Sequence, residues 1–196
     1  MSRIPVRDTE SQSSLGSPVA YLNRPVAVHP PVARVRPQAL AQGRIALSDP
    51  AVRVVTDFML ERPLTVAEDR LIDEALREMI VAGVRALVVV HGNVVTGLVT
   101  SYDIPGERPL QFLRSSNFSR HDEIEVGHIM TPWDQVPTLD WRAVRTEHVA
   151  DIVKFFKNTR ATHGAILEYL DQGGIFVRGL VSRTQLERQL GYSIYQ

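Results

Sequence analysis

The stretch "GLVTSYDI" at residues 97–104 recurs as "GLVSRTQL" at residues 179–186. Both copies keep a glycine, a pair of apolar residues and a hydroxyl-bearing residue, whereas Gln185 takes the place of Asp103. A repeated segment of this kind predicts two copies of one structural unit. Because a carboxamide carries no charge, the exchange predicts that the second copy holds a ligand less tightly than the first.

Similar predicted elements precede each copy. In the first half, apolar residues at helical spacing over 71–82 end at Gly83, and two β-branched runs follow around the turn "HGN". The corresponding stretches of the second half are "EHVADIVKFF" (147–156), "GAILEYL" (164–170) and "IFVRGLVS" (175–182). The order helix, strand, turn, strand and helix predicts a mixed α/β fold that is built twice.

The composition excludes several classes of protein. Among 196 residues, 22 Lys and Arg balance 22 Asp and Glu, so no net charge favours binding to nucleic acid or to a membrane surface. The absence of cysteine excludes disulfides and thiolate metal sites. No apolar run approaches the roughly 20 residues of a membrane-spanning helix, and the N-terminus has no secretory pattern. We therefore expect a soluble cytoplasmic protein.

The first 50 residues differ from the rest, because prolines recur through them without any apolar run of helical period. Residues 1–50 are therefore expected to form an extended or flexible N-terminal arm. The repeat then predicts a first unit over 51–118 and a second unit over 119–196.

The longer matching stretches carry a family resemblance over about residues 53–191. They are "DFMLERPLTV", "IDEALREMIVAGVRALVVV" and "GNVVTGLVTSYDI" in the first half, and "HIMTPWDQVPTL", "VADIVKFF", "THGAILE" and "VRGLVSRTQL" in the second. The chain resembles a tandem pair of CBS domains, a Bateman module of the stand-alone bacterial type. The resemblance implies an α/β (α+β) fold with two β-α-β-β-α units packed about a pseudo-twofold axis. It also implies a homodimer without catalytic activity that binds an adenosine nucleotide (AMP, ADP or ATP) between the units and signals to an effector protein.

Two residues of the first motif suit a nucleotide. Thr100 ends a predicted strand just before a helix, whose N-terminal N–H groups favour phosphate. Asp103 follows one turn later, and its carboxylate can accept hydrogen bonds from both hydroxyls of a ribose. The same spacing also suits a helix cap, in which Thr100 or Ser101 bonds the first-turn N–H groups.

The resemblance adds further candidates to this first cleft. It implies that Arg85 and Ala86, just before a strand, contact the ligand. It also implies that Pro137 and Thr138, from the loop that opens the other half, lie against adenine. Tyr102, beside Asp103, is expected either to stack on the ligand or to pack outward.

A second, weaker cleft is predicted around Ser182. Thr65 matches Thr138, and His163 is aligned with Arg85, where it is expected to meet phosphate or respond to pH. With Gln185 in place of a carboxylate, this cleft is expected to be empty or weak. A second departure lies in "PGERP" (105–109), which weakens the start of the helix in the first half.

Other functions remain as alternatives. A dimerising scaffold with vestigial clefts would bind no nucleotide. Catalysis or metal binding would need converging groups, and the candidates are histidine–acid sets that more often form surface pairs: His121–Asp122–Glu123 with His128, and His148 with Asp151. We therefore expect no catalytic and no metal site. For Trp133 and Trp141, apolar packing is favoured over base stacking.

Overall fold

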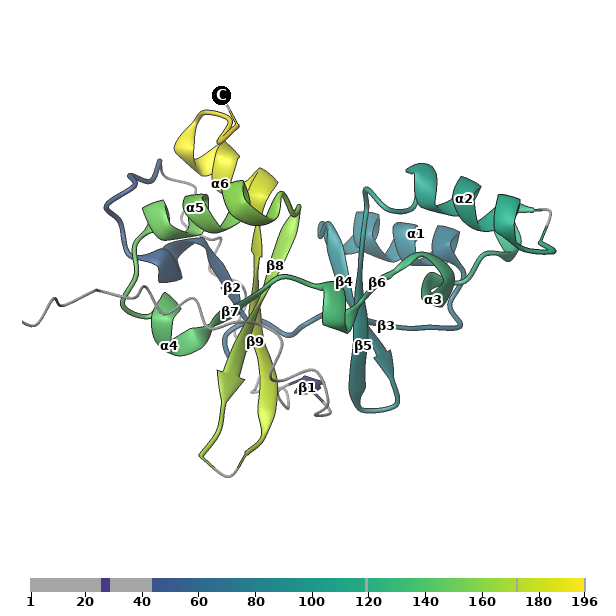
Figure 1. Cartoon of the computed structure of the whole chain (residues 1–196), viewed down its shortest axis with the longest axis horizontal. Coiled ribbons are helices and arrows are strands. Elements are labelled where there is room, and N and C mark those ends of the chain that lie inside the picture. The colour runs from purple at the N-terminus through teal and green to yellow at the C-terminus, as the bar shows by residue number, and fades with distance from the viewer. Residues whose placement is uncertain (1–25, 29–43, 119, 172, 196) are drawn as a thin grey trace, which may run out of the picture.

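The computed structural model describes residues 26–28, 44–118, 120–171 and 173–195, and two units with the same order of elements stand side by side in it (Figure 1). The first consists of β3 (Thr65–Ala67), α1 (Ile72–Ala82), β4 (Ala86–His91), β5 (Val94–Thr100) and α2 (Glu107–Ser115). The second consists of β7 (Thr138–Asp140), α4 (Trp141–Val144), α5 (Val149–Thr159), β8 (His163–Tyr169), β9 (Ile175–Ser182) and α6 (Arg183–Leu190). The β-α-β-β-α order predicted from the sequence is confirmed in both halves, with the short α4 as an insertion.

The repeat extends to the strand register. Thr65 pairs with Val88 in the first unit, and Thr138 pairs with Ala165 in the second, in parallel ladders. Each antiparallel hairpin then carries a register shift at the same place, between Val89 and Val90 or between Ile166 and Leu167. The match of Thr65 with Thr138 that the sequence predicted is therefore confirmed.

Each hairpin also accepts a short strand from the segment that precedes the other unit. The strand β2 (Val55–Asp57) leads into the first unit but pairs with β9 of the second. Conversely, β6 (Thr131–Pro132) leads into the second unit and pairs with β5 of the first. This reciprocal exchange is the arrangement that a pseudo-twofold axis between the units requires.

The N-terminal segment contributes one further strand. β1 (Val26–Val28) lies between β5 and β9, parallel to the latter, so that nine strands of the described residues form one sheet. Part of the predicted arm is thus extended, as expected, but it pairs with both units. The rest of the arm up to residue 43 lies outside the described residues.

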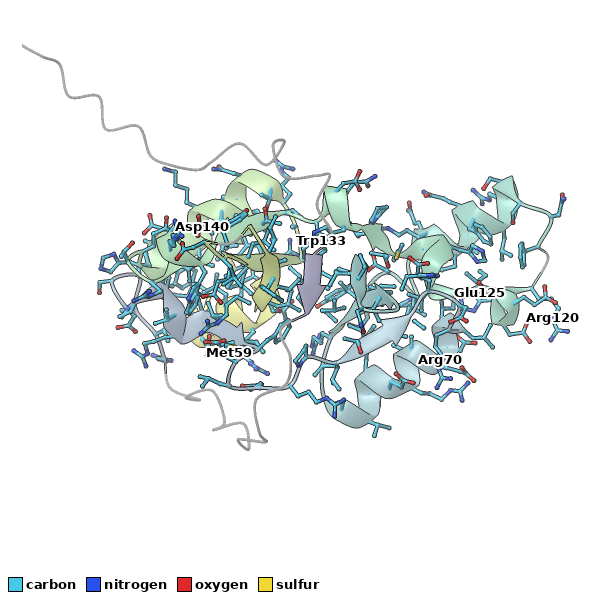
Figure 2. The ribbon with its side chains drawn as sticks, turned by 90° about the horizontal axis from the view of Figure 1, so that it is seen from below. Met59, Arg70, Arg120, Glu125, Trp133 and Asp140 are labelled. Atoms are coloured by element: carbon cyan, nitrogen blue, oxygen red, sulfur yellow. The ribbon has the colours of Figure 1, made fainter. Side chains whose placement is uncertain are left out.

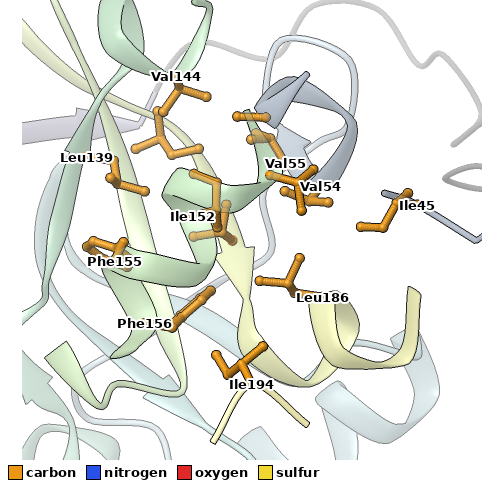
Figure 3. Close-up of a cluster of buried hydrophobic side chains, with 14 of the residues drawn as sticks. Ile45, Val54, Val55, Leu139, Val144, Ile152, Phe155, Phe156, Leu186 and Ile194 are labelled. Carbon is orange, nitrogen blue, oxygen red and sulfur yellow. The ribbon is translucent and has the colours of Figure 1, made fainter. Parts of the chain in front are cut away.

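The hydrophobic cores follow the exchange of strands. Ile45 and Val54, which precede the first unit, pack with Phe156 and Leu186 in the core of the second (Figure 3). Three short helical segments, η2 (Ala51–Val54), η3 (His121–Glu123) and α3 (Val126–Ile129), connect these parts. Ile124, Val126 and Ile129, which precede the second unit, pack in the core of the first with Ile72, Met79 and Leu87. The packing therefore crosses the boundary predicted between residues 118 and 119.

A third cluster of buried side chains joins the two hairpins, with Val88 and Leu98 from one and Ala165 and Val177 from the other. Trp133, in the short helix η4 (Trp133–Gln135), packs against it at the junction of the units (Figure 2). Trp141 packs against the core of the second unit. Apolar packing of both tryptophans is thus confirmed.

An ion-pair network fixes β2 against the second unit. The guanidinium of Arg178, on β9, donates to both carboxylate oxygens of Asp57 at 2.8 and 2.9 Å. Its third nitrogen donates to Glu168 at 2.9 Å, and the group lies 4.3 Å from the ring centre of Trp141. Bidentate pairs of this kind are directional, so this one sets the register in which β2 pairs with β9 and also stabilises that pairing.

The glycine of each motif has a steric cause. A Cβ on Gly179 would lie 2.3 Å from the carbonyl oxygen of Thr56, and a Cβ on Gly97 would lie 2.6 Å from that of Thr131. Both carbonyls belong to the exchanged strands, which pass over the motif strands where the glycines leave room. The repeated glycine is thus required by the strand exchange itself.

We expect Gly97→Ala and Gly179→Ala each to lower the free energy of unfolding by about 1–3 kcal/mol, because a backbone carbonyl cannot swing aside as a side chain can. Urea unfolding measures this loss. Gly92→Ala is the control: its Cβ meets no atom within 4 Å, and only its positive φ of 60° adds a cost of about 1 kcal/mol. A Gly179→Ala protein as stable as the wild type would contradict the strand exchange.

Candidate functional site

A cavity of about 400 Å³ lies between the two units, next to the second motif. One wall comes from β2, the loop after it and the start of β4, and includes Arg62, Arg85 and Ala86. The other wall comes from β8, β9 and α6, and includes His163 and three motif residues: Ser182, Thr184 and Gln185. The volume is in the range of small-ligand pockets.

Arginines dominate the charge of this cavity. Arg62, Arg85 and Arg188 line it, and within the described part of the chain no carboxylate forms an ion pair with any of them. Glu61 is the acidic residue among the described lining residues; burial and then the nearby Asp57 raise its pKa. Unpaired guanidinium groups in a concave surface bind anions, and phosphate suits their planar donors.

The start of α6 adds to this preference. The helix begins at Arg183, directly after its N-cap Ser182, so its first turn lies at the cavity wall. The N-terminus of a helix carries a partial positive charge that favours anions. The second motif therefore has the junction of strand and helix that the sequence predicted for the first.

The buried imidazole of His163 completes the wall. The residue is 6% exposed, and its Nδ1 lies 3.2 Å from the hydroxyl of Thr162. Burial, then the positive charges of Arg183 and Arg85, lower the pKa of His163 to about 4. The imidazole is therefore neutral at pH 7.

The register corrects one alignment made from the sequence. His163 pairs with Ser182, while Ala86 pairs with Thr100, the counterpart of Ser182. His163 thus corresponds to Ala86, and the alignment of His163 with Arg85 was wrong by one residue. The strand register decides the alignment.

The first motif is engaged within the chain. One carboxylate oxygen of Asp103 accepts from both the backbone N–H and the hydroxyl of Thr100, each at 2.8 Å. The other oxygen lies 3.5 Å from Nε of Arg108, whose Nη1 donates to the carbonyl of Ile129 and the hydroxyl of Thr131. These bonds hold a local turn and are not the helix cap weighed above, because the carboxylate accepts from Thr100 and the following helix begins only at Glu107. Arg108 connects this turn to the segment before the second unit.

The helix of the first motif begins late. α2 starts at Glu107 after its N-cap Gly106, and Pro105 and Gly106 separate it from the strand end at Thr100. Its N-terminal N–H groups therefore do not follow Thr100 directly. The weakened helix start predicted from "PGERP" is confirmed.

The predicted residues of the first cleft do not all come together. Arg85 and Ala86 line the cavity beside the second motif, whereas Thr100, Asp103, Pro137 and Thr138 are not among its lining residues. The carbonyl of Pro137 accepts from the N–H of Ala165 at 2.9 Å, within the second unit. Arg85 and Ala86 therefore line the cavity beside the second motif, and their place in a cleft around Asp103 stays a prediction.

Tyr102 joins the two motifs. Its hydroxyl lies 3.0 Å from that of Thr184, its counterpart in the second motif, and accepts from Arg85 at 3.3 Å. The hydrogen bond to Thr184 is the largest cause of a lowered pKa for the Tyr102 hydroxyl. Burial raises this pKa, and the hydrogen bond to Arg85 lowers it. Thr65 lies in an adjoining hollow of about 360 Å³, which shares Leu64 with the cavity.

Sequence reasoning missed several wall residues: Arg62, Thr184 and Arg188. Arg188 lies three positions after Gln185 on α6, so the helical period could have placed it on the same face. No pattern marked Arg62, because its place depends on how the loop after β2 folds.

The histidine–acid candidates have local roles instead. Asp151 accepts from the N–H of His148 at 3.0 Å in a capping box of α5, and His128 accepts from the N–H of Glu125 at 3.2 Å. The ring of His128 stacks on Phe112 with 4.3 Å between centres. Among the described residues, no three such side chains converge on a metal position, and no described helix is long and apolar enough to cross a membrane.

Comparisons with known proteins found the following similarities. Residues 55–105 match the family model of the CBS domain. A protein with CBS domains from Burkholderia ambifaria has 23% identity over 65% of this chain and 82% of its own, with a TM-score of 0.48. A conserved protein from Pyrococcus horikoshii has 22% identity over 72% and 92%, with a TM-score of 0.49. CBSX2 in complex with AMP has 19% identity over 72% and 94%, with a TM-score of 0.48. No curated protein matches the sequence.

The first unit is therefore a CBS domain. The second unit repeats its element order, its hairpin register and its bulge, which supports a tandem CBS module. The recognition made from the sequence is confirmed at this level.

We expect the stability of the protein to fall as the pH drops from about 6.5 to about 4. In this window the unfolded state protonates His163, while the folded state does not, because the folded pKa is about 4. The lost free energy of unfolding is at most about 3 kcal/mol. Urea unfolding between pH 7 and 4 measures the slope. His163→Gln should flatten it, whereas His91→Gln, at an exposed position, should not. Equal slopes for wild type and His163→Gln would overturn this account.

Proposed function

We propose that the protein is a non-catalytic regulatory module that binds an adenosine nucleotide (AMP, ADP or ATP) in the cavity between its CBS units. The observation that carries the proposal is a cavity with three arginines, none ion-paired within the described residues, beside the first turn of α6. Arginine and a helix N-terminus both recognise phosphate. The ligand then regulates a second copy of the chain or an effector protein.

The position of the cavity supports regulation. Arg62 and Arg85 belong to one side of the junction, and Ser182 and Gln185 belong to the other. A nucleotide held by both sides favours one arrangement of the units over others, because a ligand shifts an equilibrium by its differential affinity for the states.

The dimerising scaffold stays as the second candidate. It is favoured by Asp103, whose two oxygens are already held by Thr100 and Arg108. In this view the first motif only connects α2 to the segment before the second unit. The regulatory module and the scaffold then differ in one property, which is whether a ligand binds at the second motif.

Nucleotide binding is tested by isothermal titration with AMP, ADP and ATP. We expect binding by the wild type and a loss of at least about tenfold in Arg85→Gln, because a charge-assisted bond to phosphate contributes about 1.5–3 kcal/mol. The matched control is Arg142→Gln, an exposed arginine on α4 that does not line the cavity and lies 3.7 Å from Asp171.

The first motif provides the contrasting variant. Asp103→Asn should bind as the wild type does, since Asp103 does not line the cavity. Strong loss in Asp103→Asn with full binding by Arg85→Gln would place the site at the first motif instead. If millimolar nucleotide does not raise the melting temperature of the wild type, nucleotide binding is excluded and the dimerising scaffold is the remaining function.

We also propose a homodimer formed through an apolar surface on the last turn of α1. Ile80 is 70% exposed and Val81 is 90% exposed, and Val81 borders the hollow that contains Leu64 and Thr65. Adjacent apolar side chains exposed to this degree mark an interaction surface.

Val81→Glu should turn this dimer into a monomer, because a charge would be buried without a partner. Light scattering after size-exclusion chromatography measures the mass. Val94→Glu, at another exposed apolar position, serves as the control. An unchanged mass for Val81→Glu would exclude this surface as the dimer contact.

A further inference from the structure

The exchange at the end of the second motif changes the chemistry around the ribose. A carboxylate at this position accepts from two ribose hydroxyls but repels a phosphate attached to either of them. The carboxamide of Gln185 accepts less well, but its NH₂ group donates to a phosphate oxygen without repulsion. Gln185 lines the cavity, so the exchange acts on any ligand there.

Arg188 supplies a positive charge at the same place. It follows Gln185 by three positions on α6, which puts both side chains on one face of the helix, and both line the cavity. Within the described residues, its guanidinium forms no ion pair. In dinucleotide-binding folds, a carboxylate recognises the free 2′-hydroxyl, and a nearby arginine accommodates a 2′-phosphate. Gln185 and Arg188 match the arrangement that accommodates a phosphate on the ribose, because a carboxylate is missing and an arginine is nearby.

The remaining arginines come from the opposite wall. Arg62 and Arg85 lie on first-unit elements, and Arg188 lies on α6 of the second unit. A ligand with phosphates at both ends of its ribose would meet a cation on each wall, whereas a ligand with only a 5′-phosphate would leave one wall unpaired.

We propose that the cavity selects adenine nucleotides that carry a phosphate on the 2′- or 3′-hydroxyl of the ribose over nucleotides with a free diol. The inference rests on the function proposed above and narrows its ligand class. Gln185 and Arg188 recognise the ribose phosphate, and Arg62 and Arg85 recognise the 5′-phosphate.

Calorimetric titration of the full chain tests this with three probes of matched composition: adenosine 3′,5′-bisphosphate, adenosine 2′,5′-bisphosphate and ADP. All three carry two phosphoryl groups, so the comparison isolates their position on the sugar. We expect at least one bisphosphate to bind about tenfold or more tightly than ADP. ADP binding as tightly as both bisphosphates would overturn the inference while leaving the proposed function intact. Failure of all three probes to bind would overturn both.

Two variants assign the residues. Arg188→Gln should lower bisphosphate affinity more than ADP affinity, so that the bisphosphate preference disappears, and Gln185→Asp should reverse the order in favour of ADP. Arg142→Gln is the matched control for loss of one arginine. Melting temperatures of the free proteins confirm that the variants fold. A bisphosphate preference that survives both substitutions would show that these residues do not read the ribose, and would overturn the assignment.

Discussion

The passage of two backbone carbonyls over Gly97 and Gly179 is the constraint on which the rest of the structure depends. Because these glycines leave room for Thr131 and Thr56, each unit takes the strand that precedes the other. The exchange draws residues on either side of β2 toward the second motif, and so puts arginines of the first unit opposite Ser182 and Gln185. The cavity therefore follows from the strand exchange, which brings its two walls together.

The two motifs have diverged in complementary ways. The first keeps its carboxylate, but Pro105 and Gly106 move the helix start away from Thr100, and Arg108 takes up the charge of Asp103. The second lost its carboxylate, yet α6 starts at once after Ser182 and arginines gather near it. Electrostatics thus favours an anion at the second motif, although the sequence of the motifs alone favours the first.

Local patterns predicted the fold well, and long-range geometry explains what they missed. The amphipathic period over 71–82 and the glycine turns were sufficient for α1 and the hairpins, and the repeated motif indicated two units, while the CBS architecture followed from the family resemblance. The strand exchange was not predictable, because β2 and β6 are two or three residues long and carry no periodic signal. For the same reason the sequence did not predict that Arg85 lines the cavity beside the second motif. The three-residue spacing of Asp103 from Thr100 suggested a local contact between them, but the contact with Arg108 depended on where α2 begins.

A regulatory role needs a contact that changes when the cavity is filled, and Tyr102 is placed to provide it. Its hydroxyl accepts from Arg85 at only 3.3 Å, while its backbone N–H donates to the hydroxyl of Thr100, which is bonded to Asp103. An anion in the cavity competes with the Tyr102 hydroxyl for the guanidinium of Arg85, because the planar guanidinium cannot donate fully to both acceptors at once. Contiguity alone does not establish coupling, because the turn must also have two arrangements that the ligand distinguishes. The turn between Thr100 and α2 lies outside the helix and is held by the contact of Asp103 with Arg108, so it is the element in which the second arrangement would have to exist.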